Sequence, residues 1–397
     1  MSPADFYRRF ELDDSIVRET GFNPYYCSIQ SGLSDPVRVD GRDFVDLASN
    51  NYLGLAADAR VTRAVMMAVE RYGASMCGTP IATGCHELYR DLERKIASFL
   101  GLEDAVILPS AYQANNAVFG VVAGKEDVIL IDHFAHSSLV QGARAAGCTI
   151  RPFLHNDPAH LRSILGKRKD ARQAFVVTES VFSTEGSIAP FRDIIEICRE
   201  HRAVPVIDDS HGIGVIGGGG RGVLDHFGIR DYDGIYTASL GKALANAGGV
   251  IAGRKLLIDH LRYFCPHLIY STALTPGVLA GVGAVLGIVE TEFGRIGAKM
   301  RDNRDCIRNA LIAAGFAVVP GEAPINAIEA GSAVRTIRLA KAFFEERILT
   351  TPFIHPSVPV DDGRLRLIAG AHLGEASITK VLDAIPRIAR LFFGTAA

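Results

Sequence analysis

The sequence lacks an excess of charge of either sign. Its 397 residues carry 42 lysines and arginines against 44 aspartates and glutamates, for a formal net charge of −2. A chain with this balance has no global positive field that would attract nucleic acid or an anionic membrane surface. We therefore expect its partners to be small molecules or another protein chain, and we expect no nucleic acid.

Long hydrophobic runs are also missing. The longest apolar stretch covers residues 277–289 and is shorter than the ~20 residues that a helix needs to cross a bilayer. The N-terminal segment carries charges of both signs from Asp5 onward, so it lacks the apolar core of a signal peptide. These two absences predict a cytoplasmic protein with no transmembrane segment.

Cysteine pairs of the C-x-x-C type do not occur, and the cysteines are odd in number. Both facts argue against a disulfide framework and against a zinc ribbon, so we expect reduced and mostly buried thiols. Glycine, in contrast, is abundant, with 40 residues. This abundance indicates several places where the backbone turns sharply or approaches a ligand closely. The seven cysteines are Cys27, Cys77, Cys85, Cys148, Cys198, Cys265 and Cys306.

From residue 41 onward, short apolar runs alternate with longer amphipathic stretches. This alternation is typical of an α/β fold with a mostly parallel sheet and helices on both of its faces. The runs end in turn residues, which suits the strand ends of such a sheet. The predicted strands are 105–108, 128–131, 174–178, 204–207, 234–237 and 249–252, with helices at 87–100 and 192–201.

The two ends of the chain do not follow this alternating pattern. Residues 1–40 predict one helix, with spaced apolar residues from Phe6 to Val17, and then an irregular connection. A long helical region at 277–314 leads into a smaller α+β unit. We expect an N-terminal arm at 1–45, a large domain at 46–280 and a small C-terminal domain at 281–397. Within the last we predict a helix at 333–346, strands near 348–353 and at 364–368, and a helix at 376–393 interrupted by Pro386.

Two acids and a histidine follow the predicted strand at 204–207. Ligands of open α/β sheets bind beyond the carboxyl ends of the strands, so Asp208 and His211 lie where chemistry is expected. Ordinary turn capping by the aspartates is an alternative interpretation. A metal site with His133 and His136 is a further one, but no ligand spacing supports it, and we expect no metal.

Two short motifs in this region match known sequence patterns but lack the context that those patterns require. Residues 212–217 match the dinucleotide pattern G-x-G-x-x-G, which would suit an NAD-dependent oxidoreductase. That pattern must open a helix, whereas here it continues into Gly-Gly-Gly-Arg-Gly, which cannot propagate one. Residues 239–242 match the S-x-x-K motif of serine acyl-enzymes, but the K-T-G motif that accompanies it is absent from the sequence.

Lys242 follows the predicted strand at 234–237 among small residues that would let a flat ligand approach the backbone. Burial at such a place lowers the pKa of a lysine, so that its neutral amine can form a Schiff base with a carbonyl group. The alternative is a solvated surface lysine, which is the usual situation of a single lysine. The glycine-rich strand end favours the Schiff-base interpretation.

Several long motifs, in consistent order from about residue 40 to 375, resemble the α-oxoamine synthases. These are fold type I pyridoxal phosphate (PLP) enzymes that condense an amino acid with an acyl-CoA and lose the carboxyl carbon. The resemblance is specific for the family but not for one member, although some phrases also resemble its autoinducer synthases. The matching segments are Ser49–Leu55, Asp132–Leu139, Thr178–Ser183, Val206–Gly212, Thr237–Leu244 and Arg364–Leu367.

The resemblance implies roles around the cofactor ring. Lys242 would hold PLP as an internal aldimine and then act as the base that removes the α-proton. Asp208 would face the pyridine nitrogen and keep it protonated, which makes the ring an electron sink. His211 and Ser183 would bind near the phenolic oxygen, and His136 would stack on the ring face unless it is only a satisfied core histidine.

The phosphate of PLP suits a helix N-terminus. The predicted strand at 105–108 leads into a helical pattern, so the amides of Ala111 and Tyr112 would bind the dianion, with a hydroxyl from Ser239. The family usually has glycine at the position of Ala111. By resemblance, Ser271 and Thr272 would reach the phosphate of another subunit, which implies a homodimer with shared sites. Ordinary loop hydroxyls are the alternative.

Substrate residues are implied at the C-terminal strand. Arg364 and Arg366 share one face of that strand, and a guanidinium can grip a carboxylate with two hydrogen bonds. The motif selects Arg366, with Asn50 nearby, for the amino acid, and leaves Arg364 as a solvated or structural residue. Relatives use glycine, alanine, serine or 2-aminobutyrate with varied acyl groups, so the substrate pair stays open. Transamination and aldolase-like cleavage remain alternative reactions, whereas a non-catalytic partner subunit would typically lack Lys242.

Overall fold

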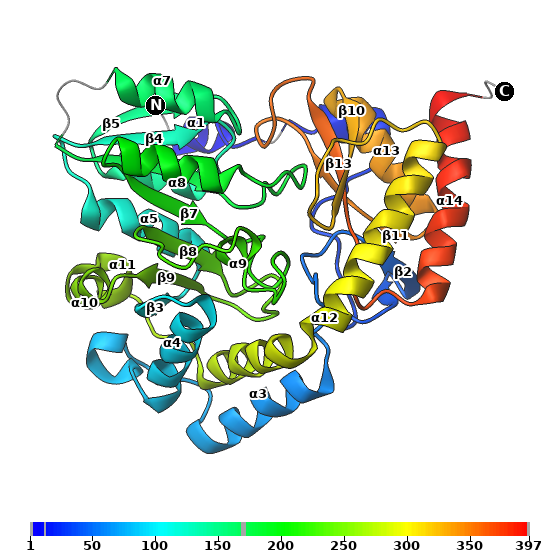
Figure 1. The fold of residues 1–397 in the computed structure, drawn as a ribbon. Coiled ribbons are helices and arrows are strands. Elements are labelled where there is room, and N and C mark those ends of the chain that lie inside the picture. Colours follow the sequence, from blue (N-terminus) through cyan, green and yellow to red (C-terminus); the bar gives the residue numbers. More distant parts are fainter. Residues whose placement is uncertain (1–2, 12, 168–171, 395–397) are drawn as a thin grey trace.

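A seven-stranded sheet forms the centre of the computed structural model, which describes residues 3–11, 13–167 and 172–394. The strand order is β3-β9-β8-β7-β6-β4-β5 (Figure 1). Strand β9 is antiparallel to both of its neighbours, and the other pairings are parallel, so the predicted mostly parallel α/β sheet is confirmed. The strands are β3 (Asp104–Leu108), β4 (Val128–Asp132), β5 (Thr149–Phe153), β6 (Ala174–Glu179), β7 (Val204–Asp208), β8 (Ile235–Ser239) and β9 (Gly249–Gly253).

Helices cover both faces of this sheet because successive residues of each strand point to opposite sides. Val176 and Ile207 pack into one core, whereas their neighbours Val177 and Val206 pack into the other. Strands buried on both faces need continuous apolar runs, which is what the sequence provides. The first core includes α4 (Glu87–Leu100), α7 (Pro158–Gly166) and α8 (Phe191–Glu200), and the second includes α5 (Ala111–Val122), α6 (Ser137–Ala145), α10 (Lys255–Phe264) and α11 (Pro266–Ile269).

A smaller C-terminal domain is built on an antiparallel sheet of order β10-β13-β12. Strand β2 pairs in parallel with β11, so the N-terminal strands join this part of the molecule rather than the large sheet. The elements are β1 (Val37–Val39), β2 (Arg42–Asp46), β10 (Ile325–Gly331), β11 (Ile348–Leu349), β12 (Thr351–Phe353), β13 (Gly363–Ile368), α13 (Ala333–Glu345) and α14 (Glu375–Phe393).

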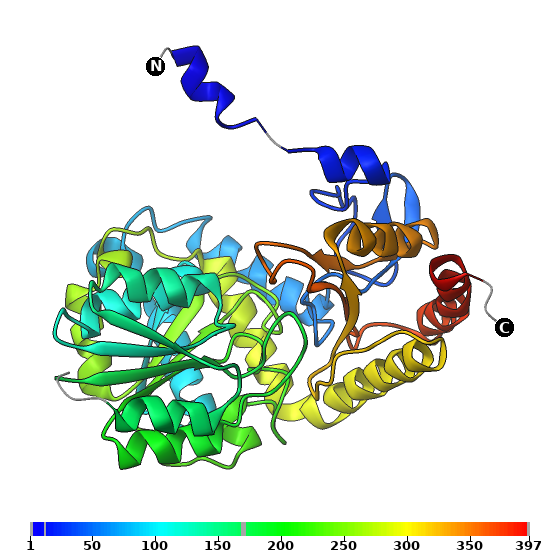
Figure 2. The same cartoon turned by 90° about the horizontal axis from the view of Figure 1, so that it is seen from above.

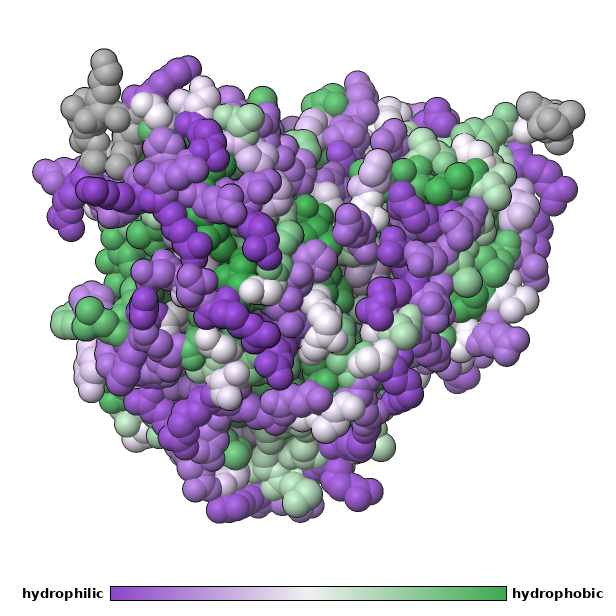
Figure 3. Space-filling view, in the orientation of Figure 1, coloured by the Kyte–Doolittle hydropathy of each residue, from purple (hydrophilic) through white to green (hydrophobic). Residues whose placement is uncertain are grey.

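Helix α12 (Pro276–Ala313) connects the two domains and packs along α3 (Ala59–Tyr72) (Figure 1). Among the described residues it is the one helix whose length and composition would allow it to cross a membrane. Its apolar residues are used inside the protein: Val282 and Leu286 lie in the large core, and Ile307 and Leu311 lie in the small one. The surface over α12 mixes hydrophilic and hydrophobic side chains (Figure 3). Helix α12 is therefore a core helix.

Helix α14 continues through Pro386, where the sequence predicts an interruption. Proline removes one backbone donor, and its ring crowds the carbonyl one turn earlier. However, Ile385, Ile388 and Ala389 are buried beside it in the core of the small domain. Packing on both sides of the proline therefore keeps the helix in one piece.

The N-terminal segment forms two short helices, α1 (Pro3–Arg8) and α2 (Ser15–Thr20), instead of the single helix that its apolar spacing predicts. Phe6, Phe10 and Val17 are exposed, and α1 stands away from the rest of the molecule (Figure 2). Helical periodicity indicates one continuous helix only where a core covers the whole apolar face; here α2 contacts α13, whereas the aromatic side chains of α1 and the residues after it stay exposed.

Several smaller expectations also differ from the structure. The sequence does not single out β5 or β10, because Arg151, Pro152 and Glu329 interrupt their apolar patterns. Residues 348–353 form two short strands rather than one. The cysteines are free but mostly not buried, since only Cys198 and Cys265 are buried. Residues 212–217 form turns and a bridge and do not open a helix, which agrees with rejecting the dinucleotide motif.

Candidate active site

The carboxyl ends of three neighbouring strands bring the predicted chemical groups together. Asp208 ends β7 and lies in register with Glu179, which ends β6, and with Thr237 near the end of β8. Lys242 follows three residues after β8 ends at Ser239. These residues are adjacent because parallel strands end at the same edge of a sheet.

Asp208 is 4% exposed and is held by both of its carboxylate oxygens. The side-chain amide of Asn115 donates to Oδ2 at 2.7 Å, and the backbone N–H of Ser210 donates to Oδ1 at 2.9 Å. Asn115 also donates to Ser138 Oγ at 2.9 Å and accepts from Thr237 Oγ1 at 2.6 Å. Asn115 fixes the orientation of the carboxylate, and the sequence does not predict this role because the contact joins α5 to the sheet.

Lys242 is half-buried, and burial is the main cause that lowers the pKa of its amine. The negative charges of Asp208 and Glu179 oppose this effect, whereas the positive charge of Arg366 adds to it. A lysine with a lowered pKa has more of its amine in the neutral, nucleophilic form. The structure therefore provides the environment that the sequence predicts for this residue.

Glu179 is a further titratable group at this edge, and only its motif was noted from the sequence. It is 5% exposed, and burial together with the charge of Asp208 raises its pKa to about 8, although Lys242 acts in the opposite direction. The backbone N–H of His136 donates to its Oε1 at 2.6 Å. Its position directly after the predicted strand at 174–178 is the signal that could have identified it.

His136 lies at the N-terminal cap of α6 and is accessible from a cleft. Its Nδ1 is 2.7 Å from Ser138 Oγ and accepts from the backbone N–H of Ser138 at 3.2 Å. Desolvation lowers the pKa of the imidazole, and the charge of Asp208 only partly compensates. The result is a neutral ring, fixed at one nitrogen, with its surface open to a ligand.

His211 is buried, with its Nδ1 2.8 Å from the hydroxyl of Tyr52. Burial holds the pKa of His211 well below its ordinary value, and the positive charges of Lys242 and Arg366 contribute. Tyr52 belongs to a motif noted from the sequence, but the bond to His211 could not be foreseen. The two residues are far apart in the chain and meet only in the folded structure.

Arg366 reaches this region from β13 of the small domain. Its Nη1 donates to the backbone carbonyl of Ser183 at 3.1 Å, and its guanidinium lies 4.9 Å from the ring centroid of Phe353. The buried Nε of Arg366 has no hydrogen-bond partner, and neither has the buried Oδ1 of Asn50. A buried polar atom without a hydrogen-bond partner destabilises the folded state unless a ligand supplies the missing bond. Arg364 is not solvated, because it pairs with buried Glu185.

The N-terminus of α5 rests directly on the sheet. Helix α5 begins at Ala111, and Ser110 Oγ caps it by accepting from the backbone N–H of Gln113 at 3.1 Å. A Cβ at Gly249 would lie 2.5 Å from both N and Cα of Ala111, so only glycine allows this approach. The first-turn amides, including that of Tyr112, are the groups that bind anions at helix N-termini.

The three hydroxyl residues that the sequence predicts for the phosphate have different surroundings. Ser271 Oγ accepts from the side-chain amide of Gln113 at 3.3 Å, which places it beside the first turn of α5 in the same chain. Thr272 is exposed. Ser239 Oγ accepts from the backbone N–H of Gly241 at 3.1 Å at the end of β8. The residues present therefore fit the phosphate of PLP on α5.

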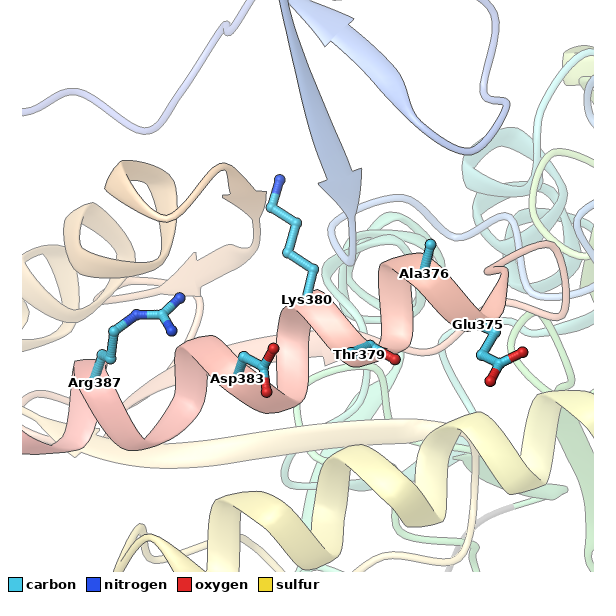
Figure 4. Close-up of a pocket in the computed structure, with 6 residues that line it drawn as sticks. All are labelled: Glu375, Ala376, Thr379, Lys380, Asp383 and Arg387. Carbon is cyan, nitrogen blue, oxygen red and sulfur yellow. The ribbon is translucent and has the colours of Figure 1, made fainter.

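A cleft of about 730 Å³ opens between the domains over this strand edge. His136, Glu179 and Ser183 line it from the large domain, and Phe353 and Arg364 line it from the small one. A second hollow, of about 790 Å³, lies on α14 and shares no lining residue with the cleft (Figure 4). Its lining comes from that helix alone: Glu375, Ala376, Thr379, Lys380, Asp383 and Arg387.

Comparisons with known proteins agree with this arrangement. The model of the family aminotransferase class I and II matches residues 42–385. The chain is 34% identical over 383 residues to 8-amino-7-oxononanoate synthase of Trichlorobacter lovleyi, covering 96% of this chain and 98% of the relative. It is 32% identical over 396 residues to 2-amino-3-ketobutyrate coenzyme A ligase of Salmonella typhimurium, covering 98% of each.

Solved structures show the same fold. The serine palmitoyltransferase of S. paucimobilis, solved with bound PLP and myriocin, aligns with a TM-score of 0.94 at 21% identity. The alignment covers 99% of this chain and 100% of that chain. Sequence, fold and site together show that the chain belongs to the aminotransferase class I and II family and, within it, to the α-oxoamine synthases, PLP-dependent acyltransferases that condense an amino acid with an acyl-CoA and release CO2.

Proposed function

We propose that this chain joins a small amino acid to an acyl-CoA at the strand edge formed by Asp208 and Lys242. The observation that carries the proposal is the pairing of a lysine of lowered pKa with a carboxylate whose two oxygens are already oriented. Bound PLP supplies an electron sink for negative charge that develops on the α-carbon of the amino acid. The remaining steps depend on residues of the chain.

Lys242 and Asp208 have complementary tasks in this proposal. The neutral Nζ of Lys242 would attach the cofactor and would also be the base that takes the α-proton of the amino acid. Asp208 would hold the pyridine nitrogen of the cofactor, because a carboxylate there favours the protonated form of that nitrogen. Asn115 and Ser210 support this role because their donated hydrogen bonds prevent the carboxylate from rotating.

The other predicted residues surround the ring and the phosphate. The accessible ring of His136 would stack on the cofactor, and buried His211 would bind near its phenolic oxygen with Ser183. The amides of Ala111 and Tyr112 and the hydroxyl of Ser239 would hold the phosphate. The support for this placement is the close contact of α5 with the sheet, which brings the helix end near the other groups.

Arg366 and Asn50 bind the carboxylate of the amino acid. One guanidinium nitrogen of Arg366 is used by the carbonyl of Ser183, which fixes the plane of the fork and leaves the other nitrogens for the substrate. The bond joins a loop of the large domain to a strand of the small domain. Arg366 also acts on Lys242, because its positive charge adds to the burial that lowers the pKa of that lysine.

We further propose a cytoplasmic homodimer in which Ser271 and Thr272 reach the phosphate of the partner subunit. In the chain, the arm is 1–45, the cofactor-binding domain 46–280 and the small domain 281–397. The dimer is supported by two tyrosines beside the proposed phosphate site, Tyr112 and Tyr270. Their side chains are 49% and 83% exposed in the single chain. Large apolar side chains at such a place suit burial by a second copy.

The first experiment is the visible absorption spectrum of the purified protein before and after borohydride, followed by peptide mapping. We expect a yellow protein that bleaches, with the reduced cofactor attached to Lys242. Lys255→Ala is a matched control, because that exposed lysine pairs only with surface residues such as Asp259. A protein that stays colourless after addition of PLP would contradict the proposal.

A second experiment distinguishes condensation from other PLP reactions. Release of free CoA is measured with glycine, alanine, serine or 2-aminobutyrate and a series of acyl-CoAs. Condensation predicts CoA release only when both substrates are present. Turnover of the amino acid without any acyl-CoA would instead indicate transamination or aldolase-like cleavage.

A further inference from the structure

Four charged side chains form a continuous chain of contacts beside the cleft, and we call this set the interdomain charge chain: Asp132, His155, Glu185 and Arg364. The two ring nitrogens of His155 lie 3.0 Å from Asp132 Oδ1 and 2.8 Å from Glu185 Oε1. The second oxygen of Glu185 pairs with Nη1 of Arg364. Their side chains are at most 19% exposed, so these contacts lie largely out of water.

The signs of charge alternate along this set. Burial by itself lowers the pKa of His155, but its hydrogen bonds to Asp132 and Glu185 outweigh burial and raise the pKa to about 9. His155 is therefore a cation at neutral pH, with a carboxylate on each side. The ring also stacks on Phe134 and meets Phe182 edge-on, so it cannot easily reorient. A buried ion-pair network of this kind holds its members in one geometry.

Each end of the interdomain charge chain is attached to a segment that presents a proposed site residue. Asp132 Oδ1 accepts from the backbone N–H of Phe134 at 2.8 Å and so shapes the turn that leads to His136. At the other end, Arg364 is two residues from Arg366 on β13, and both side chains are buried. Residues at this spacing point to the same side of a strand.

The loop after β6 is bound to β13 at two successive points. Arg366 donates to the carbonyl of Ser183, and Arg364 pairs with Glu185. The next residue, Gly186, accepts from the backbone N–H of Ala323 at 3.1 Å, which adds a third contact to the small domain. The carboxylate of Glu185 is thus the point where the two domains and the loop that carries Ser183 are joined.

We propose that Glu185, held by His155, is a positioning residue that sets the guanidinium of Arg366 at the distance and angle needed to bind the carboxylate of the amino acid. The inference rests on the proposed function, because it takes Arg366 as the substrate-binding group. Loss of the Glu185 charge leaves Arg364 buried without its main partner, so β13 shifts to solvate it. A displacement of about 1 Å is enough to weaken a two-point hydrogen-bonded grip substantially.

The test is Glu185→Gln in the holoenzyme, a change that keeps shape and removes the charge. We expect the KM of the amino acid, and its dissociation constant from the cofactor absorbance, to rise about tenfold, while the KM of the acyl-CoA changes less than about twofold. Glu346→Gln is the matched control, because Glu346 pairs with Arg387 on the outer surface of the small domain. We expect it to leave both KM values unchanged.

A second variant tests the interdomain charge chain at His155, the other partner of Glu185. His155→Gln can still form hydrogen bonds but cannot carry the positive charge, and we expect it to raise the amino-acid KM selectively as well. If the KM values of both substrates and the cofactor content change in parallel with the melting temperature, Glu185 is only a structural residue and the inference is wrong. Unchanged amino-acid binding in a folded variant would also overturn it.

The wild-type protein separates this inference from the proposed function. If the wild type releases CoA in the presence of an amino acid and an acyl-CoA, the proposed function holds, and the variants then judge the positioning role alone. If the wild type shows no such reaction, the proposed function fails independently of Glu185. The ratio of the two KM values is the deciding quantity in every variant.

Discussion

Asn115 offers the sharpest test of how the site is built. It is 2% exposed and makes three side-chain hydrogen bonds, to Asp208 at 2.7 Å, to Ser138 at 2.9 Å and to Thr237 at 2.6 Å. Asn115→Ala removes all three and leaves each partner buried without Asn115. A buried polar group that loses its partner costs about 1–3 kcal/mol, and the carboxylate lies at the upper end of that range. We therefore expect the free energy of unfolding to fall by roughly 3–5 kcal/mol.

The substitution also affects cofactor binding, because Asp208 loses the bond that orients its Oδ2. We expect the variant to release PLP more readily than the wild type. The assays are urea unfolding, followed by circular dichroism, and cofactor absorbance after dialysis. The matched control is Asn116→Ala, because Asn116 is the next residue of the same helix and donates only to backbone carbonyls, at 3.0 Å.

For this control we expect a loss of about 1 kcal/mol and no change in PLP retention. The reasoning is refuted if the two variants differ by less than about 1 kcal/mol in the free energy of unfolding and retain PLP equally. In that case the hydrogen bonds of Asn115 would contribute no more than those of a partly exposed asparagine. The orientation of Asp208 would then depend on Ser210 and on the strand itself.

Three further predictions concern pH, the phosphate site and the substrate. The pKa of His155 is raised to about 9 in the folded state, so its positive charge stabilises the fold fully below its unfolded pKa of about 6.5. This stabilisation is lost as the pH rises through 9. We therefore expect His155→Gln to flatten the dependence of the free energy of unfolding on pH between about 6.5 and 9. Gly249→Ala places a Cβ against the backbone of Ala111, so we expect weaker PLP binding, measured by absorbance titration. Arg366→Lys loses the planar fork, so we expect a rise of about tenfold in the KM of the amino acid in the CoA-release assay, and no change for the acyl-CoA.

The sequence alone predicts the elements whose pattern is local. The continuous apolar runs of β4, β6, β7 and β8 identify buried parallel strands, and the residues after them, Asp208 and Lys242, follow from the rule that ligands bind at strand ends. The start of α5 at Ala111 is likewise a local signal, because a strand leads through proline and serine into a helical pattern.

What the sequence does not predict depends on contacts between distant segments. Asn115 meets Asp208 only because α5 packs on the sheet, and Tyr52 meets His211 across 159 residues of chain. Helix α14 continues through Pro386 because of packing that no local pattern contains. Arg364 was predicted to be solvated or structural, and only its buried partner Glu185 decides between these two.

Burial affects the protonation states of four groups around the strand edge. Burial favours the neutral forms of His136, His211 and Lys242, and it raises the pKa of Glu179 to about 8. The buried site therefore favours the uncharged form of each of these four groups.

Two groups remain charged, and they come from different domains. The negative charge of Asp208 acts on Lys242, Glu179 and His136, and it comes from the large sheet. The positive charge of Arg366 comes from β13 of the small domain. The first matches a protonated pyridine nitrogen, and the second matches a substrate carboxylate. Because the two charges lie on separate domains, the contact between the domains sets the distance between them, and the amino acid that fits is the one whose carboxylate and α-carbon span that distance.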